Sequence, residues 1–204
     1  MRRFGQRGFT LLELIIALSI VGALLIIAFG GLRVGIAAWG QGENRAEINA
    51  HVRGVMMTLG RALGATYPYR GSLTQAPDSV LLFRGTESRL EFVTQTPPFP
   101  PAIPVAFTAV VLATENDNGP ALVIRQRILP NREPFTQAAV ALRDPAVQQV
   151  AFRYLNDSGA WQDTWDADTE NGLPRAVQAT ITMVRQGRTE TMPPLTVALK
   201  AAVQ

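Results

Sequence analysis

The sequence has no cysteine, one histidine and one lysine among its 204 residues. Without cysteine, no disulfide can stabilise a domain, whatever compartment the domain occupies. Because His51 is the only histidine and there is no cysteine, the sequence has no pair of His or Cys residues at the spacing of a metal site. A catalytic site built around histidine is also poorly supported. A folded domain in this chain must therefore be held together by its apolar core alone.

A true excess of positive charge is also lacking. The formal charge of +3 arises from Arg2, Arg3 and Arg7, because the chain without residues 1–8 has 16 basic and 16 acidic side chains. The other arginines are scattered and form no basic patch interleaved with aromatic residues. The composition therefore does not indicate DNA or RNA binding.

Charged residues are absent from Leu14 to Leu32, where Ser19 is the only polar side chain. Counted from Phe9, this segment forms a helix about 36 Å long, enough to cross a hydrocarbon core of roughly 30 Å. The preceding arginines predict a single-pass protein whose N-terminus stays in the cytoplasm, with the rest of the chain exported.

A cleaved secretory signal peptide is the alternative interpretation, and a small-x-small triplet at Ala28-Phe29-Gly30 is compatible with it. That interpretation leaves Glu13 unexplained, because a carboxylate at mid-membrane costs about 2.5–3.5 kcal/mol. Glu13 either lies near the interface or has a cationic partner. A cut after Gly8 creates such a partner, because the new amino group of Phe9 lies one helical turn before Glu13.

A basic leader, a hexapeptide and an apolar helix follow one another at the N-terminus. The hexapeptide is Gly8-Phe9-Thr10-Leu11-Leu12-Glu13. This arrangement resembles the prepilin signature of type IV pilins and type II secretion pseudopilins. The resemblance implies that a prepilin peptidase cleaves between Gly8 and Phe9 and that Phe9 is then N-methylated. It also implies that Glu13 guides subunit assembly.

The fold class expected from periodicity is α+β. Apolar residues at spacings of three and four predict that the helix continues to about residue 65, with an amphipathic face for its own domain or a partner helix: Ile48, Val52, Val55, Met56, Leu59 and Leu63. Beyond it, alternation of apolar and polar residues predicts antiparallel strands packed on that helix. The clearest cases are Val150–Tyr154, Val177–Met183 and Leu195–Leu199. Gly64 predicts the stop of the helix, Asn118-Gly119 predicts a hairpin between two strands, and Gln186-Gly187 predicts a further turn.

The expected organisation is a leader (1–8), a transmembrane helix (9–32), an amphipathic helix extension (33–65) and a periplasmic β-rich head (66–204). Two segments of the head are ambiguous. Five prolines between Pro97 and Pro104 form either a rigid surface loop or an extended docking strip. Asp166, Asp168 and Glu170 form either a solvated loop or a calcium site, and we favour the loop.

The segment 152–183 carries a second resemblance, to the C-terminal half of the J-type minor pseudopilin of type II secretion systems. Its features are Phe152–Leu155, a turn followed by Trp161 and Trp165, and the strand Leu173-Pro174-Arg175-Ala176-Val177. From the residues alone, the two tryptophans are core or edge aromatics beside a turn. The resemblance supplies no catalytic residue, metal or cofactor.

These resemblances imply a minor pseudopilin of the inner membrane. Its implied partners are the I- and K-type minor pseudopilins and the major pseudopilin. With them it would initiate the pseudopilus at the tip and support protein export across the outer membrane. A minor pilin of a type IV pilus or competence system is the first alternative. A membrane-anchored enzyme and an anchored receptor for exported substrates are more distant ones, and no convergent catalytic set favours the enzyme.

Overall fold

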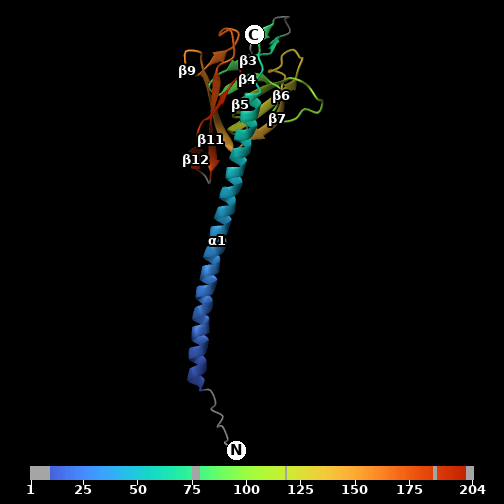
Figure 1. Cartoon of the computed structure of the whole chain (residues 1–204). Helices are drawn as coiled ribbons and strands as arrows, with labels where there is room; N and C mark the ends of the chain where they lie inside the picture. The colour runs from blue at the N-terminus through green and yellow to red at the C-terminus, as the bar shows by residue number, and fades with distance from the viewer. Residues whose placement is uncertain (1–9, 75–78, 118, 186–187, 201–204) are drawn as a thin grey trace, which may run out of the picture. The chain divides into compact units, whose positions relative to one another are not determined.

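The computed structural model describes residues 10–74, 79–117, 119–185 and 188–200 (Figure 1). One long helix, α1 (Leu11–Gly64), is followed by thirteen strands in this part of the chain. The chain divides into two compact units, Met1–His51 and Val52–Gln204. The second unit, here called the head, therefore includes the last turns of α1. The class is α+β, as predicted.

Within the first unit, the helix presents apolar side chains in every direction. A membrane-compatible stretch runs from Leu11 to Ile36, a few residues beyond the end expected at Leu32. Its one hydroxyl is satisfied inside the helix, because Ser19 Oγ donates to the carbonyl of Ile15 at 2.8 Å. An apolar helix without a polar face is typical of a membrane span.

Within the head, the same helix has only one buried face. Leu59 and Leu63 are fully buried, and Val52, Val55 and Met56 pack partly buried against the same core. The predicted packing of the amphipathic face on the chain's own domain is thus confirmed for these residues. The side chain of Ile48 lies outside the described ones.

The helix ends at Gly64, where the sequence predicts its stop. Its end is tied to a strand of the head through buried Thr94, whose hydroxyl donates to the carbonyl of Ala62 at 2.8 Å. Backbone bonds from Gln95 to Ala65 and from Tyr67 to Val93 extend this connection. The carbonyls of Arg61 and Leu63 accept the backbone N–H groups of Ala65 and Thr66, and Thr94 supplies the donor for Ala62 between them, so strand and chain together satisfy the end of the helix.

A six-stranded antiparallel sheet has the order β10-β3-β4-β5-β6-β7. Its strands are β10 (Trp165–Asp166), β3 (Phe83–Gly85), β4 (Arg89–Thr94), β5 (Thr108–Glu115), β6 (Ala121–Ile128) and β7 (Ala139–Asp144). The predicted hairpin between β5 and β6 is present, with Gly119 at φ 86°. Its other predicted turn residue, Asn118, lies outside the described residues.

A second antiparallel sheet has the order β12-β11-β8-β9, with β13 also paired to β11. Its strands are β8 (Val147–Leu155), β9 (Trp161–Gln162), β11 (Ala176–Arg185), β12 (Arg188–Thr191) and β13 (Leu195–Ala198). The short pair β1 (Arg70–Gly71) and β2 (Val80–Leu81) stands apart. The predicted turn at Gln186-Gly187 falls outside the described residues.

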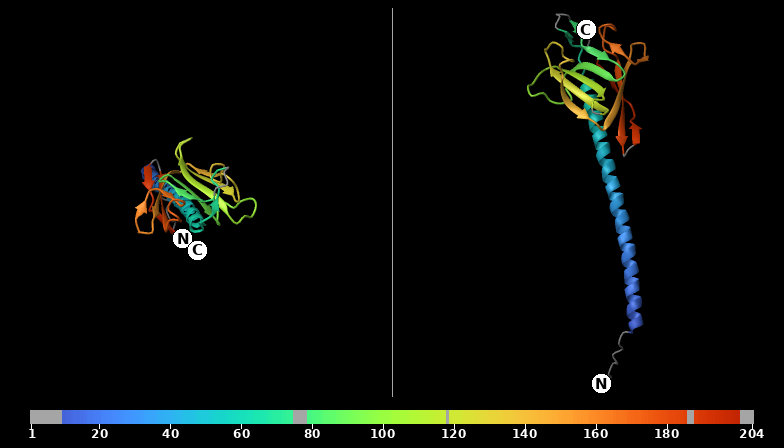
Figure 2. Two further views of the ribbon diagram at one scale, coloured as in Figure 1. Left: turned by 90° about the horizontal axis from the view of Figure 1, so that it is seen from above. Right: turned by 180° about the vertical axis from the view of Figure 1, so that it is seen from behind.

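The main core of the head is filled by α1 and by one face of each large sheet. Strands β8 and β11 contribute alternate residues, among them Phe152, Tyr154, Val177 and Ile181, all fully buried. The two views in Figure 2 show the two sheets as separate layers of the head. Sequence periodicity predicted the strands, and the structure adds that they divide into two packed sheets.

Tyr154 shows how tightly this core is built. Its hydroxyl donates to the carbonyl of Thr86 at 2.9 Å, and burial raises the pKa of the phenol far above its ordinary value. A β-carbon added at Gly85 would overlap the Tyr154 ring and hydroxyl. Only glycine fits at that position, because the tyrosine fills the space beside the strand.

Candidate functional site

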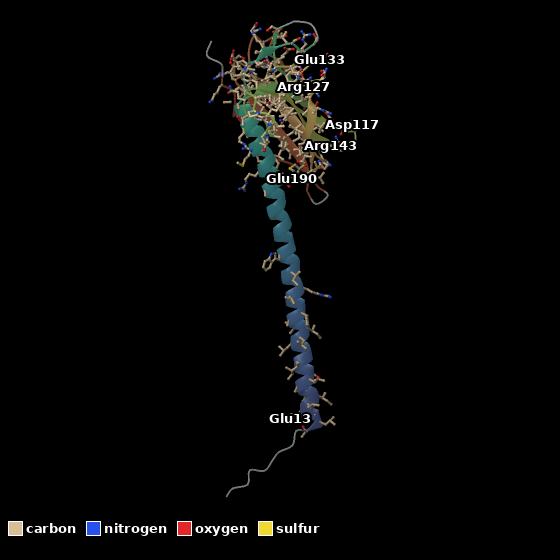
Figure 3. All side chains as sticks on the ribbon, turned by 90° about the vertical axis from the view of Figure 1, so that its right-hand side faces the viewer. Glu13, Asp117, Arg127, Glu133, Arg143 and Glu190 are labelled. Carbon is tan, nitrogen blue, oxygen red and sulfur yellow. The ribbon has the colours of Figure 1, made fainter. Side chains whose placement is uncertain are left out.

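The first turn of α1 is closed by a reciprocal pair of side-chain contacts between Thr10 and Glu13. The Glu13 backbone N–H donates to Thr10 Oγ1 at 3.3 Å, and the Thr10 backbone N–H faces Glu13 Oε2 at 3.5 Å. Thr10 immediately precedes the helix and Glu13 is its third residue, which is the arrangement of a capping box. Figure 3 labels Glu13 at this end of the helix.

This role for Glu13 was not predicted from the sequence, although the signal was there. A threonine followed three residues later by glutamate, directly before an apolar run, is the pattern of a capping box. Glu13 thus has a partner in its own chain before any other subunit arrives. The carboxylate also lies at the positive end of the helix dipole, which favours a negative charge there.

The predicted cleavage site, Gly8 and Phe9, lies outside the described residues. The capping box begins at Thr10, one residue after Phe9 in the sequence. Cleavage and N-methylation at Phe9 therefore stay predictions at this point.

The acidic loop is organised by ion pairs and backbone contacts. Asp166 Oδ2 accepts from Arg84 Nε at 3.0 Å, while its Oδ1 accepts the Asp168 backbone N–H at 3.1 Å. The first carboxylate of the run, Asp163, pairs with Arg153 at 3.0 Å. Across the described residues, no group of three or more His, Cys, Asp or Glu side chains is gathered that could hold a metal ion. Calcium binding by Asp166, Asp168 and Glu170 stays an untested hypothesis.

The two tryptophans beside this loop lie as expected for core and edge aromatics. Trp165 is almost fully buried and its indole N–H donates to the carbonyl of Gly172 at 3.0 Å. Trp161 is half-buried on the edge strand β9. Trp165 therefore ties the loop, at Gly172, to the head.

The proline-rich segment is a surface loop with a fixed anchor. The Phe99 backbone N–H donates to Gln126 Oε1, and Gln126 Nε2 donates back to the Phe99 carbonyl, both at 2.9 Å. The prolines on either side line a groove of about 620 Å³ whose opposite wall includes Thr58 and Arg61 of α1. The expectation of a surface loop is met, and the loop forms one wall of a groove as well.

An ion pair between Arg125 and Glu115 joins two neighbouring strands of the six-stranded sheet. Arg125 donates to both oxygens of Glu115, with Arg125 Nη2 at 2.9 Å from Glu115 Oε2. The hydrogen bond from Arg125 lowers the pKa of Glu115 below its usual 4.5, despite partial desolvation. The same bond raises the pKa of Arg125. This pair links strands β5 and β6 and is a structural feature of the head.

Comparison with known proteins identifies the family. Residues 30–193 match the family described as type II secretion system (T2SS), protein J, and residues 3–29 match the prokaryotic N-terminal methylation motif. The chain is 29% identical over 201 residues to the type II secretion system protein J of Xanthomonas campestris pv. campestris, covering 94% of this chain and 92% of that protein.

The two matches meet at residues 29 and 30, within the apolar stretch of the helix, and together they cover most of the chain. A methylation motif followed by an exposed apolar helix is the arrangement of a membrane-anchored protein. The match over the head favours a type II secretion component over the type IV pilus alternative. The chain belongs to the type II secretion system protein J family, a family of structural pseudopilins that associate with other pseudopilins of that system.

Proposed function

We propose that this protein is a minor pseudopilin inserted once in the inner membrane, with residues 1–8 in the cytoplasm and the head in the periplasm. The arginines of the leader support this orientation, because positive residues stay on the cytoplasmic side. The observation that carries the proposal is the carboxylate of Glu13 at the start of an otherwise apolar span, where it is the fifth residue after the proposed peptidase cut.

Maturation would begin with cleavage between Gly8 and Phe9 by the prepilin peptidase, followed by N-methylation of Phe9. The match of residues 3–29 to the methylation motif supports this step. The cut removes three arginines and leaves a cationic amine directly before the capping box at Thr10. The mature chain thus has one cation and one anion at the cytoplasmic end of its span.

In the proposed assembly step, the Glu13 carboxylate meets the N-terminal amine of a neighbouring subunit. Opposite charges in an apolar medium attract strongly, while either charge alone is costly there. In the free subunit, the capping box would stabilise the Glu13 carboxylate, because Thr10 donates hydrogen bonds to it within the same chain. Pairing between chains would then place adjacent helices in a common register.

The partners we propose are the I- and K-type minor pseudopilins at the tip and the major pseudopilin below them. Their complex would initiate the filament and so support export of folded proteins across the outer membrane. Membership of the protein J family supports this role.

Two variants of Glu13 test the proposal. Glu13→Gln keeps an oxygen that can accept from Thr10 but removes the charge, whereas Glu13→Ala removes both. We expect both variants to insert into the membrane and both to reduce filament incorporation and secretion by about tenfold or more, since an unpaired intramembrane charge costs over 2 kcal/mol. Secretion at the parental level with Glu13→Gln would refute the charge-pairing role and leave only capping.

A further inference from the structure

The outward side of the last turns of α1 carries a straight row of exposed residues. Arg53, Met57 and Arg61 are spaced four residues apart and lie opposite the buried face of the helix. Residues four apart on a helix lie above one another, so the three side chains form one stripe. We call these residues the outer stripe. In Figure 1 these turns pass in front of the strands of the head.

The outer stripe combines two cations with an apolar centre. Met57 is 58% exposed and stands between the two arginines. Among the described side chains, no ion pair involves Arg53 or Arg61. Met57 is thus a flexible apolar side chain that is more than half exposed, flanked by two arginines that pair with no carboxylate among the described residues, and this composition is suited to protein contacts.

Open space beside the outer stripe allows a partner to approach the helix closely. Gly54 lies next to Arg53 on the same side of the helix, and nothing lies within 4 Å of where its β-carbon would be. At its other end the stripe opens into the groove between Arg61 and the proline-rich loop. The double hydrogen bond between Phe99 and Gln126 holds that loop in place, so the groove is formed before a partner arrives.

We propose that the outer stripe and its groove bind an α-helix of another pseudopilin subunit, one that carries two acidic residues about two turns apart with apolar residues between them. This inference rests on the proposed function, since it names the surface through which the subunit meets a neighbour. Arg53 and Arg61 are separated by about 12 Å along the helix axis, which sets the spacing of the carboxylates.

The positive charge of the outer stripe distinguishes among the partners that could bind it. A second copy of this chain would bring the same two arginines to the contact, and like charges disfavour that pairing. Binding to an anionic membrane usually requires a cluster of about four to eight basic residues, and the stripe has two. A helix fits better than a strand, because a row of exposed side chains four residues apart on one helix is a ridge that packs into the groove of another helix.

Photo-cross-linking tests the proposal in the full chain, expressed in cells that contain the secretion system. A photo-cross-linking phenylalanine analogue at position 57 should form an adduct with another pseudopilin. The same analogue at Val140, which is 57% exposed on the edge strand β7, is the matched control and should give at most a weak adduct. An adduct at position 57 that contains only lipid, or no adduct, would overturn the proposal.

Three variants sharpen the result. Arg53→Glu with Arg61→Glu should lower the yield of the adduct by about tenfold or more, whereas Arg53→Lys with Arg61→Lys should retain most of it. Gly54→Leu should also lower the yield, by steric blocking, although it meets nothing within the head. An adduct insensitive to charge reversal would contradict the proposal.

Different experimental results would refute the docking surface and the proposed function. If the parental chain supports secretion and enters filaments but gives no pseudopilin adduct at position 57, this docking surface is wrong and the proposed function stands. If the parental chain supports neither secretion nor filament incorporation, the proposed function itself is wrong.

Discussion

The span and the head use the same apolar side chains in opposite ways. Leu18 in the span is 73% exposed, whereas Leu63 near the end of the same helix is fully buried. In the span, apolar residues surround the helix, so its whole surface requires a solvent other than water. In the head they form one stripe, and the opposite side carries Arg53 and Arg61. The arrangement of apolar residues around the helix, rather than their number, separates an anchor from a core element.

Because of this difference, leucines contribute to the folding free energy in the head and to the free energy of membrane insertion in the span. Burial of a leucine in the head stabilises the folded state by about 1.5–3 kcal/mol relative to exposure. A leucine of the span contributes nothing comparable to the head and instead contributes to membrane insertion. Three predictions test this division, from the largest expected effect to the smallest.

Leu63→Ala should destabilise the head by about 3 kcal/mol, since it removes a buried side chain and leaves a cavity. For a domain of this size that corresponds to a fall in melting temperature of roughly 10 °C. Melting followed by near-ultraviolet circular dichroism of the detergent-solubilised chain measures it. Leu18→Ala is the matched control and should leave the head's melting temperature unchanged. Equal shifts would show that the two regions are not separate.

Thr94→Val should cost about 1–2 kcal/mol, because the variant keeps the shape but leaves the Ala62 carbonyl without its donor. Thr196→Val, at an exposed position on β13, serves as the control and should change stability by less than about 0.5 kcal/mol. Chemical denaturation of the full chain in detergent measures both. No difference between the variants would mean that the tie between α1 and β4 carries no stability.

Glu115→Gln should destabilise the head by about 1 kcal/mol at neutral pH, because it breaks a partly buried pair with Arg125. The folded-state pKa of Glu115 lies below 4.5, so its contribution is present above that pH and is lost as the pH falls below it. The parental chain and the variant should therefore converge in stability as the pH falls through the lowered folded-state pKa of Glu115.

Thermal melting across pH measures that convergence. Glu170→Gln, in the exposed part of the acidic loop, is the control and should show no such dependence. A difference between Glu115→Gln and the parental chain that persists undiminished as the pH is lowered to the acid limit of the folded state would contradict the role given to this ion pair.

Much of the fold follows from local patterns, because periodicity and turn residues act over a few positions. The buried alternation of Val177, Ala179, Ile181 and Met183, the helix stop at Gly64 and the turn at Gly119 were all predicted. The capping box of Thr10 and Glu13 was not predicted, although its sequence pattern is equally local.

The remaining features depend on contacts between distant residues. The pairing of Asp166 with Arg84 joins positions 82 residues apart, and no pattern in either segment identifies the partner. The fit of Gly85 against Tyr154 and the division of the strands into two sheets have the same origin. Such features are set by three-dimensional packing, so a single sequence does not reveal them.

The most direct test of the whole account is the mass of the mature N-terminus, measured on protein from cells that contain the prepilin peptidase. We predict a chain that begins at Phe9 and carries a methyl group on its new amine, and Gly8→Ala should reduce that processing. A chain that retains residues 1–8 in those cells would contradict the account, because Glu13 would then have no N-terminal amine to meet.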